Sequence, residues 1–557
     1  MEKRLILAIV LSFLVLMGYQ YFFNKPDKSV QNPPAAAVAP PSTPVPGTTE
    51  AVQEQAKTPV EEAKQAMPGA ATPVNPEAVA GQAETDIVVD TTLYRAVWSN
   101  KGAVLRSWKL KKFKDSRKED LDLVPVLGTE IGRYPLSVGL DDADLAGRIN
   151  AALFEPSTSE LDLADGAKGE LRFVYSDGAS VRAEKTFVFK GGSYAMMTDI
   201  KVWKNGQPVT SSVLWGPGIS NVSGTEAKQS FSGARGSAVY TGGKVFRMNE
   251  RKYKPGENTY NFVDWAAYEE NYFVALFLLP PQKGRAEFLR ESAETVGGPV
   301  PAYFVYATDP TEAYIGPKDT ETLKAFGHDA KKVINFGMFG SIAEILLVIV
   351  KFCYTLIPNW GVAIILLTII IKIIFFPLTY SSTKSMAKMA DLQPKIKALR
   401  AKYKKAKTDI DQRRQMNEEM MKLYKEHGVN PAGGCLPLLI QLPVFWGIFR
   451  MLVVAVEFRH APFVFWIQDL SMKDPYYVTP VLMGITQYIS QKMTPTSADP
   501  TQAKMMLFMP IVMTFIFKDF QSGLVLYWLM TNVLQIGQQA LMNKMMHRHP
   551  TTGKARA

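Results

Sequence analysis

The stretch that most constrains the fold runs from Trp360 to Tyr380, where nearly every side chain is large and apolar. About 20 such residues make a helix long enough to cross the hydrocarbon core of a bilayer. In lipid the backbone polar groups must be paired within the segment, so this stretch predicts a membrane-spanning α-helix. The exception is Lys372, in the middle of the run Ile369–Phe376. A charged side chain at that depth costs about 2.5–3.5 kcal/mol on insertion scales, so its presence needs an explanation.

Four further apolar segments predict additional spans, at about 433–456, 476–493, 505–517 and 523–542. The segment 505–517 has only 13 residues. As a helix it would be about 20 Å long against roughly 30 Å of hydrocarbon, which predicts tilted neighbours or a locally thinned bilayer.

Two segments differ in character from these spans. The stretch 338–358 is apolar but carries Glu344 and Lys351, and it ends directly before the next apolar run. We expect an amphipathic helix lying in the membrane interface there, with a true span as the alternative. At the amino terminus two basic residues precede an apolar run that ends at residue 23, and no small-x-small cleavage site follows. This pattern predicts an uncleaved signal anchor, 1–23, rather than a cleaved signal peptide.

The region between the anchor and the first core span divides into a linker and a β domain. Residues 24–85 are rich in Pro and Ala, which predicts a disordered tether. From 86 to 335 the sequence alternates apolar and polar residues, with turn signals such as Asp-Gly and Gly-Gly. Such patterning indicates antiparallel strands. We expect one all-β domain, a large sandwich, with a barrel as the alternative.

The distribution of charge predicts the topology. The formal net charge is +11, and the segment 381–431 contains thirteen Lys or Arg against six Asp or Glu. By the positive-inside rule this segment and both termini, including the basic tail 546–557, are cytoplasmic. The β domain then lies on the outer side. The sequence therefore predicts a multi-pass membrane protein with both termini in the cytoplasm and its large domain on the outer side.

The basic segment 381–431 has the spacing of two helices. Apolar residues recur every three or four positions, and Asp409 is a suitable N-cap for the second helix. We expect a cytoplasmic helical hairpin that provides a docking surface for anionic lipids, the ribosome or a nascent chain. The alternative is a solvated connector.

Polar residues inside the predicted spans indicate a hydrated cavity. None of the spans has a carboxylate in its middle, which counts against an ion-coupled transporter. Thr368 and Lys372 share one helix face at i and i+4, and Asn532 and Gln535 do so at i and i+3. A recess open to the cytoplasm would keep the Lys372 ammonium charged, whereas partial snorkelling is the alternative. For Arg450, nearer the outer end of its span, snorkelling is the expected behaviour.

Signatures of catalysis and metal binding are lacking in the sequence. There is no P-loop, the five histidines lack zinc-ligand spacing, and the two cysteines form no CxxC pair. We therefore expect no catalytic residues, no metal and no cofactor.

Four segments resemble one known family closely. They are "MAKMADLQPKIKALRAKY", "NPAGGCLPLLIQLPVFWGIFRML", "APFVFWIQDLSMKDPYY" and "SGLVLYWLMTNVLQIGQQ". These segments, and the order of the predicted regions, are similar to the YidC-type membrane protein insertases in their long Gram-negative form. The resemblance implies a membrane α-helical core of five spans plus an amino-terminal anchor span, joined to a large periplasmic all-β sandwich domain. It also implies an insertase and chaperone of the inner membrane, which inserts and folds inner-membrane proteins, alone or with the Sec translocon, and is not an enzyme.

The family resemblance also implies a mechanism and a set of partners. A hydrophilic groove open to the cytoplasm carries one basic residue, and the matching position here is Lys372, where many relatives have Arg. Thr368, Tyr527 and Trp528 are expected to line the groove or its lipid-facing side; periodicity adds Asn532 and Gln535. The implied partners are nascent membrane proteins, components of the Sec translocon, the ribosome and anionic lipids. The alternatives are a membrane transporter and a membrane-tethered periplasmic carbohydrate-binding protein.

Overall fold

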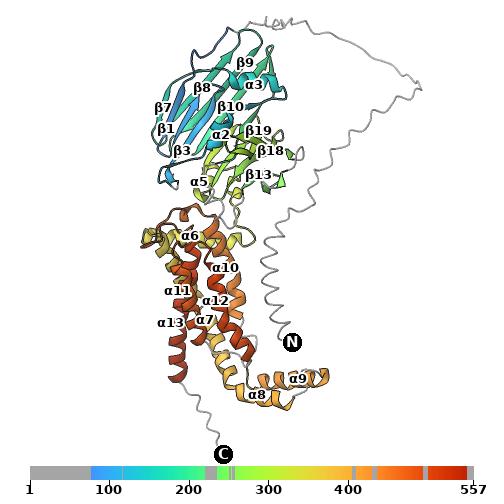
Figure 1. Ribbon diagram of the computed structural model, residues 1–557, viewed down its shortest axis with the longest axis vertical. Coiled ribbons are helices and arrows are strands. Elements are labelled where there is room, and N and C mark those ends of the chain that lie inside the picture. The colour runs from blue at the N-terminus through green and yellow to red at the C-terminus, as the bar shows by residue number, and fades with distance from the viewer. Residues whose placement is uncertain are drawn as a thin grey trace, which may run out of the picture.

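The chain forms a strand-rich part followed by a helical part (Figure 1). The computed structural model describes residues 77–115, 117–219, 235–249, 252–253, 258–403, 409–429, 436–493 and 500–548. The predicted anchor 1–23, most of the predicted linker 24–85 and most of the predicted tail 546–557 lie outside these ranges.

The strand-rich part contains three sheets. One five-stranded sheet has the order β4 (Asp120–Asp122), β3 (Val104–Lys114), β2 (Tyr94–Ser99), β1 (Asp86–Thr91), β7 (Glu160–Leu163). The ten-stranded sheet has the order β14 (Lys244–Asn249), β13 (Gly236–Thr241), β16 (Trp265–Glu269), β17 (Phe273–Leu278), β20 (Glu312–Pro317), β10 (Ala195–Lys204), β9 (Val181–Lys190), β8 (Lys168–Ser176), β6 (Glu155–Pro156), with β11 (Gln207–Val209) paired to β10. The second five-stranded sheet has the order β15 (Thr259–Asn261), β18 (Arg285–Thr295), β19 (Gly298–Thr308), β12 (Ser212–Trp215), β5 (Val138–Gly139).

The two small sheets cover the same face of the large sheet. Trp98 of β2 lies 4.3 Å from Phe187 of β9, and Trp215 of β12 lies 6.3 Å from Phe277 of β17, measured between ring centroids. A row of directly opposed residues runs from Phe277 across β20 and β10 to β9. Directly opposed residues point to the same side of a sheet, so Phe277 and Phe187 lie on the same face of the large sheet. The predicted sandwich is therefore confirmed, and the barrel alternative is wrong.

Short helices border the sandwich. They are α2 (Val126–Ile131), α3 (Ala143–Ala151), α5 (Thr320–Phe326) and the 3₁₀ helix η2 (Ala330–Val333). Both α5 and η2 lie between the last strand and the helical part, so they belong to the connection between the two.

The helical part contains eight α-helices within the described residues. They are α6 (Gly340–Leu356), α7 (Trp360–Asp391), α8 (Gln393–Lys402), α9 (Ile410–Glu426), α10 (Leu436–Val454), α11 (Val478–Met493), α12 (Pro500–Phe517) and α13 (Ser522–Arg548), with the 3₁₀ helix η4 (Val456–Phe458) after α10. Helices α7, α10, α11, α12 and α13 form a bundle, and α8 and α9 extend sideways from its far end (Figure 1).

Among the described helices, α7 is the one that is long and apolar enough to cross a membrane. Ile440–Val454 and Met506–Phe517 are shorter apolar helical segments. The predicted count of five core spans therefore stays a prediction, and so does the anchor. The short apolar segment expected near 505–517 is present as part of the longer helix α12.

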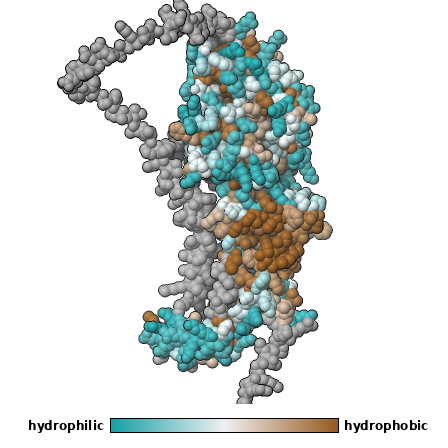
Figure 2. All heavy atoms as spheres, turned by 180° about the vertical axis from the view of Figure 1, so that it is seen from behind, coloured by the Kyte–Doolittle hydropathy of each residue, from teal (hydrophilic) through white to brown (hydrophobic). Residues whose placement is uncertain are grey.

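The surface of the helical bundle is apolar, whereas the surfaces of the sandwich and of the hairpin helices on either side of it are polar. Figure 2 shows a hydrophobic band over the helical part, between the hydrophilic sandwich and the hydrophilic hairpin helices. On α12, Phe508, Ile511 and Phe515 are exposed at helical spacing. Soluble proteins rarely expose a contiguous apolar surface of this kind, so the band indicates contact with lipid.

Helix α6 lies across the end of the bundle that faces the sandwich (Figure 1). Its exposed apolar side chains are Ile345, Val348, Phe352 and Leu356. Glu344 and Lys351 form ion pairs instead, with the connection that follows the last strand and with η4. This division between apolar and charged faces is the one expected for an interfacial helix.

The hairpin begins later than the sequence pattern predicted. Helix α7 continues without a break to Asp391, so residues 381–391 belong to the long helix rather than to the hairpin. The break occurs at Leu392 because Pro394 follows in the first turn of α8, and proline both lacks an N–H and disfavours a helical residue before it. Asp409 caps α9 as predicted, accepting hydrogen bonds from two backbone N–H groups.

Candidate functional site

Lys372 lies halfway along α7, at the point where this helix packs against α13. Its Nζ donates a hydrogen bond of 2.9 Å to Oε1 of Gln535. An ammonium has three N–H donors, and among the described residues this amide oxygen is the one acceptor recorded for it, with no carboxylate paired to it. The positive charge is therefore held by a neutral group and is not neutralised.

Helix α13 presents a polar face to its neighbours. Trp528, Asn532 and Gln535 follow one another at spacings of four and three residues, which places them on one side of the helix. Trp528 Nε1 donates to Gln487 Oε1 of α11 at 3.2 Å, and Asn532 Nδ2 donates to the carbonyl oxygen of Met483 at 3.2 Å. The same face thus contacts α11 through two residues and α7 through Gln535.

Thr368 and Tyr527 are close to this face but do not join its hydrogen bonds to Lys372. Thr368 is 1% exposed, and its hydroxyl donates to the carbonyl oxygen of Ile364 one turn earlier in the same helix, at 2.7 Å. Tyr527 is 2% exposed and hydrogen-bonds to Gln441 of α10. Both side chains are packed between helices, whereas Lys372 and Gln535 are only half-buried.

The polar face extends further than the sequence analysis predicted. Gln539 follows Gln535 at i+4 and is 1% exposed. Gln538 beside it and Gln491 on α11 also have buried amide atoms. The spacing rule that joined Asn532 to Gln535 would have found Gln539 if it had been continued by one more turn.

The connection between the sandwich and the helices is held from both sides by arginines. Arg247 of β14 donates to the carbonyl oxygens of Lys332 and Val333, at 2.7 and 2.9 Å. Arg450 of α10 donates to the carbonyl oxygens of Asn335 and Phe336. The side chain of Arg450 is thus directed toward the end of the bundle next to the sandwich, where it binds the interdomain connection; the predicted snorkelling stays a prediction.

A second set of contacts closes the outer end of the bundle. Lys351 of α6 forms ion pairs with Glu457 of η4 at 2.6 Å and with Asp319 before α5 at 3.3 Å. Arg459 donates to the carbonyl oxygen of Lys114 at 2.8 Å. The sandwich is therefore anchored on the outer loops, and the Lys372 region lies away from this junction, toward the hairpin end.

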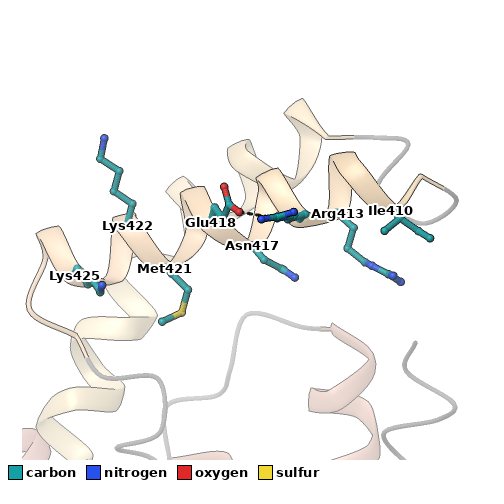
Figure 3. Close-up of a pocket in the computed structure, with 8 residues that line it drawn as sticks. Ile410, Arg413, Asn417, Glu418, Met421, Lys422 and Lys425 are labelled. Carbon is teal, nitrogen blue, oxygen red and sulfur yellow. Dashed lines mark hydrogen bonds and ion pairs between the residues drawn. The ribbon is translucent and has the colours of Figure 1, made fainter.

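The hairpin helix α9 carries a basic surface with a shallow hollow of about 630 Å³. Its lining includes four cations, the exposed apolar Met421 and Glu418, which pairs with Arg414 at 3.1 Å. The cations are Arg413, Arg414, Lys422 and Lys425. Figure 3 shows Arg413 and Met421 projecting from one side of α9 and Lys422 from the opposite side. The arrangement offers several cations and an apolar contact to an acidic surface.

The most buried carboxylate among the described residues of the sandwich, Glu269, is not free to act together with a second acid. Glu269 is 2% exposed, and its two carboxylate oxygens are bound by Arg247 at 3.0 Å and by Lys318 at 2.7 Å. Among the residues that the structure describes, no group of three His, Cys, Asp or Glu could hold a metal ion.

Comparison with known proteins gives matches over almost the whole chain. The family model described as "YidC periplasmic domain" matches residues 86–349, and the model described as "60Kd inner membrane protein" matches residues 352–549. A protein of Syntrophus aciditrophicus named membrane protein insertase YidC is 37% identical, over 98% of this chain and 100% of its own. A protein of the same name from Geotalea daltonii is 38% identical, over 98% of this chain and 99% of its own. A solved structure titled "Active YidC insertase crystal structure with the first transmembrane domain resolved" is 21% identical, covers 83% of this chain and 94% of that one, and has a TM-score of 0.36.

Proposed function

The chain belongs to the YidC family of membrane protein insertases, which are not enzymes, and we propose that it inserts inner-membrane proteins by means of the Lys372 charge. The relatives are inner-membrane proteins with a periplasmic domain, and the sandwich at 86–349 matches that domain. Their names give no support to the transporter and carbohydrate-binding alternatives.

The observation that carries the mechanism is the environment of Lys372. Its ammonium belongs to an otherwise apolar stretch of α7 and is bound to a neutral amide, with no acid recorded beside it among the described residues. In a medium of low dielectric an uncompensated charge attracts an opposite charge more strongly than in water. An acidic residue of a hydrophilic segment that enters from the cytoplasm would therefore be drawn to Lys372. Because lysine keeps the charge but lacks the planar fork of arginine, the contact is electrostatic and not bidentate.

Two further features lower the barrier to insertion in this proposal. The polar face of α13 offers hydrogen-bonding partners to a chain that would otherwise lose its water, at several kcal/mol per unpaired group. The apolar segment Met506–Phe517, which is part of the longer helix α12, has a helical length of about 18 Å and would match a locally thinned hydrocarbon layer. Apolar segments of the substrate then partition into lipid, which requires no nucleotide.

The finer topology and the partners are part of the proposal. Both termini and the hairpin lie in the cytoplasm, and the protein crosses the membrane several times, as the charge distribution predicts. The basic surface of α9 suits anionic lipids or the ribosome because both are acidic. The Sec translocon meets the sandwich and the outer loops, as the family resemblance implies.

The test is insertion by the purified full-length chain in liposomes. The substrate has one span and a short acidic tail, and protease protection of the tail measures insertion. We expect wild type and Lys372→Arg to insert it, and Lys372→Ala and Lys372→Glu to fail. Lys324→Glu on α5, an exposed lysine, is the matched charge control and is expected to insert normally. Equal insertion by all variants would show that the Lys372 charge is not used.

A further inference from the structure

Two lysines lie together at the end of the bundle next to the sandwich, where the proposed mechanism assigns them no role. Lys473 lies in the loop before α11, and Lys518 directly follows the last residue of α12. A backbone bridge between Lys473 and Gln521 brings the two segments side by side. Basic residues of membrane proteins gather on the cytoplasmic side, which the charge distribution assigns to the hairpin end, so a pair at the opposite end needs an explanation.

The two ammonium groups share one carboxylate. Lys518 Nζ lies 2.6 Å from Oδ2 of Asp519, and Lys473 Nζ lies 3.5 Å from Oδ1 of the same residue. No second acid is recorded beside either lysine among the described residues. Two positive charges and one negative charge therefore leave this cluster with a net charge of +1.

Each ammonium also lies over an exposed aromatic ring. Lys473 Nζ is 5.9 Å from the ring centroid of Tyr477, and Lys518 Nζ is 5.1 Å from that of Phe515. The two lysine side chains are 31% and 35% exposed, and Phe515 is 71% exposed. The cations and the rings are thus both accessible from outside the chain.

An exposed apolar stripe runs from each ring along its helix. On α11, Val481 and Ile485 follow Tyr477 at spacings of four residues, and on α12 Ile511 precedes Phe515 by four; all five side chains are exposed. Helices α11 and α12 pack against each other, so the two stripes are neighbours. The apolar band of the bundle ends at the sandwich (Figure 2), which places the cluster at the edge of the hydrocarbon, the level of lipid phosphates.

An anionic phospholipid matches this combination of groups. Its phosphodiester supplies the single negative charge that balances the cluster, and its oxygens accept hydrogen bonds from ammonium groups. Its acyl chains match the two apolar stripes. We propose that Lys473 and Lys518 bind the headgroup of an anionic phospholipid in the leaflet on the sandwich side, with the acyl chains along α11 and α12. This site lies at the opposite end of the bundle from the basic surface of α9, and it takes no part in the proposed insertion mechanism.

The position of the two lysines gives the bound lipid a structural effect. Lys473 belongs to the segment before α11, and Lys518 belongs to the turn after α12. One phosphate between them joins both segments and restrains the end of α12. Asp519 weakens this binding, because its carboxylate competes with the phosphate for the same ammonium groups.

A fluorophore beside the cluster measures the binding of lipid there. Tyr476 is 69% exposed and precedes Tyr477, so Tyr476→Cys carries a bimane label in the full-length chain, with Cys353→Ala and Cys435→Ser. The labelled chain is reconstituted in phosphatidylcholine liposomes that contain a rising fraction of doxyl-labelled phosphatidylglycerol or doxyl-labelled phosphatidylcholine. We expect half-maximal quenching at an about fivefold lower fraction of the phosphatidylglycerol, the factor for one basic charge at a lipid surface.

Variants of the cluster should shift this preference in opposite directions. Lys473→Gln combined with Lys518→Gln should abolish it. Asp519→Asn should raise it by a further factor of about five, because the net charge rises by one. Lys244→Gln combined with Lys324→Gln, at two exposed lysines outside the bundle, is the matched control and should leave it unchanged. The phosphatidylcholine curve should be the same in every variant and so reports correct folding around the label.

Inorganic phosphate at constant ionic strength distinguishes a lipid site from a site for a soluble anion. We expect it to leave the preference for phosphatidylglycerol unchanged, because it makes no contact with the apolar stripes. Loss of the preference in inorganic phosphate would overturn the lipid assignment in favour of a soluble anion.

Three other results would overturn the site altogether. They are equal quenching by the two lipids with the cluster intact, a preference that survives in the double variant of Lys473 and Lys518, and a preference that Asp519→Asn leaves unchanged. In the last two cases other cations would be responsible. No substrate protein is present in this assay, so a failure here is separate from a failure of the proposed insertion by Lys372.

Discussion

Replacing Arg450 by Met is expected to release the connection between the sandwich and the bundle. Methionine has a similar length but no donors, so the carbonyl oxygens of Asn335 and Phe336 lose their partner. Hydrogen bonds from charged groups contribute about 1.5–3 kcal/mol each. The bond to Phe336 is long, at 3.3 Å, and is counted as weak. We therefore expect the free energy of local opening of the connection to fall by about 2–4 kcal/mol in the variant.

Amide hydrogen exchange is the suitable assay, because a chain with two parts does not unfold in one step and a single melting temperature would not report the connection. The amides of Gly340 and Ala343, which bond to residues 337 and 339, should exchange roughly 30- to 700-fold faster in the variant. Arg95→Met is the control, because the Arg95 side chain is 55% exposed and its ion pair to Asp90 is 3.6 Å long. An acceleration below about threefold at both amides would refute the assigned role of Arg450.

Two predictions concern stability elsewhere in the chain. Partial burial raises the pKa of Asp177, but the backbone N–H groups of residues 179–181 outweigh it and hold the pKa at about 2. The charged carboxylate therefore stabilises the sandwich by about 1–2 kcal/mol above pH 4, and this stabilisation is lost as the pH falls through 2. Asp177→Asn should lower the unfolding temperature of the sandwich at pH 7 but not at pH 2. Gly361→Ala should destabilise the chain by about 1–3 kcal/mol in thermal unfolding, since the new Cβ would lie 2.0 Å from the ring of Phe463. Gly147→Ala in α3 has open space around it and should stabilise slightly; equal effects of the two glycine changes would contradict the steric argument.

The architecture was largely predictable because each part has a strong local pattern. Alternation and turn signals located the sandwich, and the apolar runs located the helices. The start of α9 followed from the preference of aspartate for an N-cap, and the structure has Asp409 there. The end of α7 differs from the prediction because the apolar spacing continues through Leu392 and hides the break that the single proline after it introduces.

A site residue could be predicted from the sequence only where its side chain had few possible hydrogen-bond or charge partners. Lys372 was singled out because a charged side chain in an apolar run has no partner within its own segment. Helical spacing from Asn532 singled out Gln535, which the structure shows to be the hydrogen-bond acceptor of Lys372. Thr368 illustrates the opposite case, since a threonine hydroxyl can bond to the carbonyl of its own helix and so need not face a cavity. The partner of Arg450 was not predictable, because the carbonyl oxygens that it binds are about 115 residues away in the sequence.

The number of acceptors distinguishes the cation that we assign to function from a cation that is part of the fold. Lys185 of β9 is fully buried, and its ammonium donates to three carbonyl oxygens, those of Gly102, Ala103 and Leu136, at 2.6–3.2 Å. Three donors and three acceptors leave no capacity for a ligand, so Lys185 serves as an internal cross-link. Lys372 has the same three donors, but its one recorded acceptor among the described residues is the amide of Gln535. Its remaining donors have no acceptor recorded among the described residues, and in the proposed mechanism a carboxylate of the acidic segment binds them, which the fully paired Lys185 could not do.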